Sequence, residues 1–104
     1  NCKNLNLVYS YQTVRVRTDA FVNCTNLKEI CLPHGTVYNN SFLGCYENIS
    51  VIEINRVIGC NRLGDIFGCN NEDFKSLSFV YLKEGNIPYG FLDNLPSNVN
   101  VIIR

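Results

Sequence analysis

A short motif that begins with phenylalanine recurs along the chain at nearly constant spacing. Successive copies begin 21, 25 and 24 residues apart, at Phe21, Phe42, Phe67 and Phe91. A cysteine follows in three of these copies and another marks an incomplete opening copy, which gives the series Cys2, Cys24, Cys45 and Cys69. Internal periods of roughly 20 to 29 residues are typical of solenoids, in which each copy forms one coil and the coils stack. The spacing therefore predicts a solenoid.

Each copy also contains a run of the form apolar-x-x-apolar-x-apolar. Because the last two apolar residues are separated by one residue, as side chains on one face of a β-strand are, the run predicts a strand with an inward and an outward face. Irregular or short helical returns are expected to connect the strands. In the opening segment, Leu7 to Val16, the pattern allows two strand registers that differ by one residue. The expected inward residues are Leu27, Ile30 and Leu32; Ile49, Ile52 and Ile54; and Phe74, Leu77 and Phe79.

The motif resembles one known family. Residues 21–33 match the Phe-x-x-Cys-x-x-Leu-x-x-Ile-x-Leu-Pro pattern of BspA-like leucine-rich repeats almost residue for residue, and residues 95–101 are similar to the final repeat of that family. The last copy departs from the pattern by carrying Leu95 where the others carry cysteine, and the return at residues 56–65 is irregular. The resemblance implies a leucine-rich-repeat solenoid, mainly β, of about five repeats.

The two ends of the chain differ in this pattern. The first copy lacks a phenylalanine before Cys2, whereas the copy that ends at Arg104 has the form of a natural last repeat. We interpret residues 1–104 as a single leucine-rich-repeat domain that forms the C-terminal part of a longer solenoid. Since a solenoid needs a polar capping unit at each end, the N-terminal end is expected to be covered by further repeats or by a partner.

The four in-phase cysteines recur at a turn that must point inward. A thiol there is a small apolar filler with a weak hydrogen-bond donor, so we expect buried free thiols, and the leucine that replaces cysteine in the last copy supports packing. Two disulfides are the alternative, although parallel side chains of stacked neighbours give poor disulfide geometry. Cys31 and Cys60 are out of phase; Cys31 should face outward and Cys60 lies in the irregular return, and their thiol state stays open.

Charge and composition exclude several classes of function. Nine basic and nine acidic residues give a net charge of zero, which argues against a nucleic-acid partner. The apolar runs are too short for membrane insertion. The single histidine, His34, leaves no complete ligand set for a metal and no nucleophile with a base and an orienting group. We therefore expect no cofactor, no metal and no catalytic residues, and interpret the chain as not an enzyme.

The outward side chains of the strands form the candidate binding surface. Their mixture of apolar, acidic and small polar groups suits contact with another protein. Asn100 and Arg104 belong to the same face. The candidate binding residues are Glu29, Cys31, Val51, Glu53, Asn55, Ser76, Ser78, Val80 and Ile102.

Two functions remain open for such a surface. The family resemblance implies a protein-protein interaction module for adhesion or recognition at the cell surface or outside the cell, since BspA-like proteins are widely surface proteins that bind host or matrix proteins. The alternative is a cytoplasmic scaffold or a structural subunit of a larger assembly. The state of the cysteines separates the two, because disulfides favour an oxidising compartment and six free thiols favour a reducing one.

Overall fold

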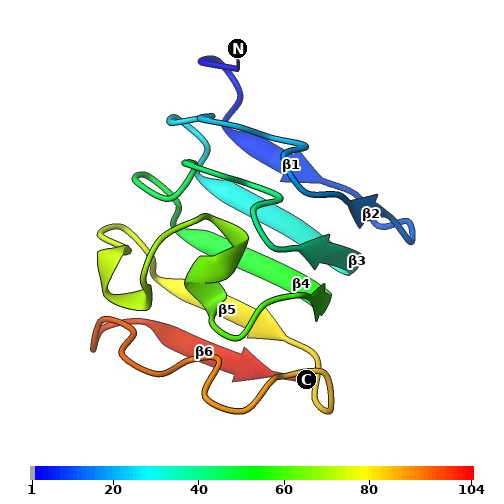
Figure 1. Ribbon diagram of the computed structural model, residues 1–104, viewed down its shortest axis with the longest axis vertical. Coiled ribbons are helices and arrows are strands. Elements are labelled where there is room, and N and C mark those ends of the chain that lie inside the picture. Colours follow the sequence, from blue (N-terminus) through cyan, green and yellow to red (C-terminus); the bar gives the residue numbers. More distant parts are fainter. Residues whose placement is uncertain (1) are drawn as a thin grey trace.

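The computed structural model describes residues 2–104, which wind into a β-solenoid of about four turns made mainly of parallel strands. Five strands stack in the order β1-β3-β4-β5-β6, and β2 pairs with the far part of β3. Figure 1 shows the strands as one twisted sheet with the two termini at opposite ends of the stack. The elements are β1 (Leu7–Tyr9), β2 (Arg15–Val16), β3 (Glu29–Tyr38), β4 (Val51–Ile58), the 3-10 helices η1 (Leu63–Ile66) and η2 (Asn71–Asp73), β5 (Phe79–Leu82) and β6 (Asn100–Ile103).

One apolar column runs through the stack on the inward face of the sheet. A single coil is too small to bury its apolar side, so the coils merge their inward residues into a shared core. The expected inward pairs Ile30 with Leu32 and Ile52 with Ile54 are confirmed, since all four side chains are at most 4% exposed. The column itself consists of Val8, Ile30, Ile52, Val80 and Val101, which are paired from strand to strand.

The expected register of the third copy is wrong. Val80 is completely buried and pairs with Ile52, whereas Phe79 is 40% exposed and points outward. The inward run is Leu77-x-x-Val80-x-Leu82, three residues later than predicted. Both runs satisfy the same apolar pattern, and only stacking against β4 distinguishes them. Val80 is therefore not on the outward face, and Ser76 and Ser78 precede β5.

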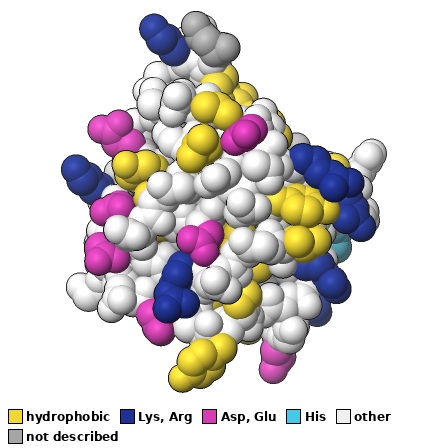
Figure 2. All heavy atoms as spheres, in the orientation of Figure 1, with side chains coloured by type: hydrophobic (Ala, Val, Ile, Leu, Met, Phe, Trp, Pro, Cys, Tyr) yellow, Lys and Arg dark blue, Asp and Glu magenta, His cyan; other side chains and the backbone are white. Residues whose placement is uncertain are grey.

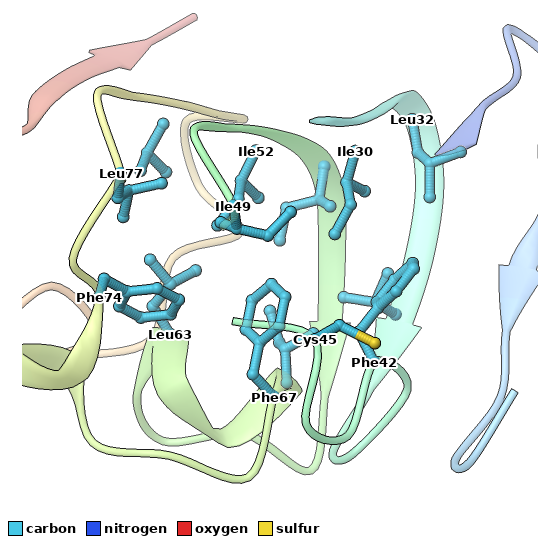
Figure 3. Packing of buried hydrophobic residues seen from close by; sticks show 14 of the residues in the cluster. Ile30, Leu32, Phe42, Cys45, Ile49, Ile52, Leu63, Phe67, Phe74 and Leu77 are labelled. Atoms are coloured by element: carbon cyan, nitrogen blue, oxygen red, sulfur yellow. The ribbon is translucent and has the colours of Figure 1, made fainter. Parts of the chain in front are cut away.

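The phenylalanines that open the first three complete copies stack on one another. The rings of Phe21 and Phe42 are parallel with centroids 5.1 Å apart, and those of Phe42 and Phe67 are 6.0 Å apart. Phe74 packs edge-on against Phe67 at 5.3 Å, so it belongs to this second column and not to the strand. Figure 3 shows Phe42, Phe67 and Phe74 on the return side of the core, below the isoleucines of the sheet. Such ring pairs add to the free energy of burial.

Tight turns precede the in-phase cysteines. Asn23, Gly44 and Gly68 have φ of 56°, 77° and 70°, and each comes directly before a cysteine. Glycine and asparagine adopt this left-handed conformation at the lowest cost, which explains why these residue types recur there. Asparagine amides then connect successive coils: Asn26 Nδ2 donates to the Lys3 carbonyl and Asn48 Nδ2 to the Thr25 carbonyl, both at 2.7 Å.

The cysteines only partly follow the expectation of free thiols. Cys2 and Cys24 form a disulfide, so the prediction is wrong for this pair. Stacking brings their Cα atoms to 5.1 Å, within the range that disulfides bridge. Cys45 and Cys69 are free, as are Cys31 and Cys60. Cys45 is the expected filler: it is fully buried, its Sγ donates to the Phe21 carbonyl at 3.5 Å, and it accepts the Cys24 N–H at 3.2 Å.

Candidate binding surface

Two rows of outward side chains flank the inward column of the sheet. The rows follow from the strand register, because residues one position before and one position after each column residue point to the opposite face. One row contains Leu7, Glu29, Val51, Phe79 and Asn100. The other row contains Tyr9, Cys31, Glu53, Tyr81 and Ile102.

Large apolar side chains are exposed in these rows. Leu7 is 45%, Tyr9 55% and Phe79 40% exposed, and the neighbouring Tyr11 is 68% exposed. The rings of Tyr9 and Tyr11 meet edge to face at 4.9 Å, and those of Phe79 and Tyr81 stack at 6.2 Å. Single exposed apolar residues are ordinary, but rows of them on one flat face mark a candidate contact surface.

Five of the candidate binding residues lie in the rows: Glu29, Cys31, Val51, Glu53 and Ile102. Their part in binding stays a prediction. Asn55 lies where β3 bulges away from β4, and both its carbonyl and its side-chain oxygen accept hydrogen bonds from Asn86 Nδ2. Asn55 therefore anchors the return between β5 and β6, and this contact occupies its side-chain oxygen.

Sequence reasoning missed the aromatic members of the rows. Phe79 and Tyr81 were lost with the register of the third copy. Tyr9 was lost because the register of the opening segment stayed open. The run Leu5-x-x-Val8, which has the spacing of Leu27-x-x-Ile30, would have placed Tyr9 outward.

An ion pair lies at the edge of the second row, at the C-terminal end of the chain. Arg104 pairs with Glu53 at 3.1 Å, and its guanidinium carbon lies 4.6 Å from the centre of the Tyr81 ring. Since the Arg104 side chain is 60% exposed, solvent screens the pair and its contribution to stability is small. The pair does orient the guanidinium beside a depression of about 260 Å³. The lining residues are Pro33, His34, Glu53, Ile54, Tyr81, Leu82, Lys83 and Arg104.

The free cysteines are not activated for chemistry. Burial raises the pKa of Cys31, and Glu29 and Glu53 raise it further. Burial, followed by the nearby carboxylates Asp65 and Asp73 respectively, raises the pKa of Cys60 and of Cys69 to about 12. Because the thiolate is the nucleophile and the metal ligand, a raised pKa disfavours both roles for these residues at neutral pH.

Residues 2–104 contain no group of three or more histidine, cysteine or acidic side chains arranged to hold a metal ion. The same residues contain no helix with the length and apolar character that crossing a membrane requires.

Comparison of the chain with protein-family models, with curated proteins and with solved structures found no match. The candidate surface is a parallel sheet with two outward rows of mainly aromatic and aliphatic side chains, and each row contains one carboxylate, Glu29 or Glu53.

Proposed function

We propose that this chain is a protein-protein interaction module that binds a partner through the two outward rows. The observation that carries the proposal is the exposure of Leu7, Tyr9 and Phe79 on one face of a parallel sheet, beside Glu53 and Arg104. Aromatic residues and arginine are enriched at the centres of protein interfaces, and a flat solenoid sheet offers an extended surface for them. The chain is not an enzyme in this proposal.

The proposal includes the leucine-rich-repeat family and a count of about five repeats. Support comes from the inward run Leu27-x-x-Ile30-x-Leu32, which recurs in register as Ile49-x-x-Ile52-x-Ile54. The phenylalanine stack and the turn residues before each cysteine support it as well. Within that family, the features are similar to those of BspA-like repeats.

We further propose an extracellular or cell-surface location, with a cytoplasmic scaffold as the alternative. The disulfide between Cys2 and Cys24 supports the first location, because disulfides persist in oxidising compartments. Intact mass of the protein from its native source, with and without alkylation, tests this. One disulfide and four alkylated cysteines would favour the surface location, whereas six alkylated cysteines without reductant would favour the scaffold.

Binding to a panel of purified extracellular-matrix proteins tests the interaction surface. Replacing Tyr9 and Phe79 together by serine removes exposed apolar area from both rows, so we expect the response in biolayer interferometry to fall by about tenfold or more. The matched control is Tyr89→Ser, since Tyr89 is 101% exposed but lies outside the rows. Equal loss in both variants, or no loss in the double variant, would contradict the assignment to the outward rows.

A further inference from the structure

A second group of strand pairs lies beyond a bend in β3, apart from the two outward rows. The register shifts between Leu32 and Thr36, and after the bend Arg15 of β2 and Arg56 of β4 flank Thr36. The next position along each strand is a valine, and Val16 and Val37 are buried. The arginines therefore project from the outer side of this small sheet.

We name this surface the basic facet. Arg15, Arg17 and Arg56 are all exposed. In Figure 2 dark blue side chains gather with hydrophobic ones along the right edge, where Figure 1 places β2 and the ends of β3 and β4. The basic facet consists of Arg15, Arg17, Thr36, Tyr38, Arg56 and Ile58.

Tyr38 holds two of the arginines in place. Arg15 Nη1 donates to the Tyr38 hydroxyl at 2.9 Å, and the guanidinium carbon of Arg17 lies 5.1 Å from the centre of the Tyr38 ring. These contacts leave most of the guanidinium N–H donors unused, since each arginine has five. A partner that meets them loses less side-chain entropy than it would with free arginines.

The basic facet has no carboxylate of its own. The one ion pair among residues 2–104 joins Arg104 to Glu53, so the three facet arginines are not neutralised within the described chain. The chain as a whole is neutral, with nine basic and nine acidic residues. Seven of the nine acidic residues lie in the returns, at Asp19, Glu47, Asp65, Glu72, Asp73, Glu84 and Asp93.

A shallow depression with a partly apolar lining adjoins the basic facet. It has a volume of about 350 Å³ and lies between the end of β4 and the turn at residues 85–88. Asn86 holds that turn against β4 through its hydrogen bonds to Asn55 at 2.9 and 3.0 Å. Ile58, Ile87 and Pro88 supply apolar lining beside Arg56. This depression suits an apolar side chain, which a polysaccharide or a nucleic-acid backbone does not carry.

We propose that the basic facet binds an acidic segment of a partner protein, with its carboxylates on Arg15, Arg17 and Arg56 and an apolar side chain in the adjoining depression. Arginine pairs with carboxylates through two parallel hydrogen bonds, and the apolar contact selects a peptide among anionic partners. The facet is separate from the two outward rows, so the inference does not depend on the function proposed for them.

The test uses a short fluorescein-labelled peptide of glutamates interrupted by single leucines, with fluorescence anisotropy as the readout at low ionic strength. We expect R15Q/R17Q/R56Q to weaken binding by about tenfold or more. The matched control K3Q/K28Q/K75Q removes the same three charges from exposed lysines elsewhere and should bind as the unaltered chain does. Ile58→Ser should abolish the preference for this peptide over an all-glutamate peptide while leaving charge-dependent binding.

Several outcomes would overturn the inference. Equal weakening in the lysine variant would show that net charge alone governs binding. Equal binding of a peptide with glutamine in place of glutamate would remove the role of the carboxylates. Tighter binding of heparin or of single-stranded DNA, with no effect of Ile58→Ser, would assign the facet to another class of polyanion. Circular dichroism confirms that each variant is folded, so that a loss of binding reports on the facet.

Discussion

Two returns bring the chain back to the same strand register by different means. The return at residues 39–50, between β3 and β4, is short and turns through Asn40 and Gly44, both with positive φ. The return at residues 59–78, between β4 and β5, is longer and contains η1 and η2. Asp65 and Asp73 cap these helices by accepting backbone N–H bonds at 2.8 to 3.0 Å.

The longer return carries its own internal support. Asn71 is 3% exposed; its Oδ1 accepts the Gly64 N–H at 2.8 Å, and its Nδ2 donates to the carbonyls of Phe91 and Asp93 at 2.9 and 2.7 Å. In the shorter return the buried Ser41 hydroxyl donates to the Val16 carbonyl and accepts the Tyr38 N–H, and the one amide link is the bond of Asn48 to the coil before it. The comparison teaches that the apolar column sets the strand register, while the returns absorb differences in length.

The largest expected effect distinguishes Phe74 from Phe79, the two aromatic residues whose burial depends on the register of the third copy. Phe74→Ala leaves a cavity against Phe67, and we expect it to lower the free energy of unfolding by about 3 to 5 kcal/mol. Phe79→Ala is the matched control, since Phe79 is 40% exposed, and should cost less than about 1 kcal/mol. Urea denaturation measures both, and similar losses in the two variants would argue for the register that places Phe79 inside.

The next effect concerns the first coil, which a covalent bond ties to its neighbour. Cys2→Ser opens a disulfide that closes a sequence separation of 22 residues, so we expect a loss of about 3 kcal/mol. The unaltered chain and Cys69→Ser, which both keep the disulfide, should lose the same amount in reductant, whereas Cys2→Ser should show no dependence on reductant. A Cys2→Ser variant as stable as the oxidised chain would contradict this.

Asn71→Ala compares the two returns directly. It leaves buried backbone groups without partners, so we expect a loss of about 2 to 3 kcal/mol. Asn48→Ala removes the corresponding amide of the shorter return, where solvent reaches the freed carbonyl, and should cost about 1 kcal/mol. Thermal and urea unfolding of both variants check the order, and a larger loss for Asn48→Ala would reverse our account of which return depends on its amide.

The smallest expected effect comes from two thiols of the longer return, the buried Cys60 and the half-buried Cys69. The pKa of Cys60 and of Cys69 is raised from 9.0 to about 12, so the unfolded chain releases these protons first as the pH rises. Their contribution is fully present below about pH 9 and is lost progressively toward pH 12. The free energies of unfolding of the unaltered chain and of C60A/C69A should therefore converge as the pH rises from neutral to about 10.5. Measurements stop at about pH 10.5 because tyrosine side chains also lose their protons in this range. Parallel curves would contradict it.

Much of the architecture follows from local chemistry. The spacing of the phenylalanines and cysteines implies stacked coils, and the runs that contain Ile30 and Ile52 identify their strands correctly because no competing apolar run lies nearby. In the third copy two overlapping runs satisfy the same pattern, so sequence alone had no means of choosing between Phe79 and Val80. The predicted binding surface consequently omitted Phe79 and Tyr81.

The sequence by itself determined the repeat, the parallel strands and the turn residues, because period, alternation and backbone conformation are encoded by neighbours along the chain. Tertiary structure decided the rest. The Cys2–Cys24 disulfide depends on how closely two coils approach. The basic facet depends on the pairing of β2 and β4 with the far part of β3, which places Arg15 and Arg56 on either side of Thr36. Contacts between residues far apart in sequence depend on how the coils pack against one another and not on the pattern of neighbouring residues, so only the folded chain defines them.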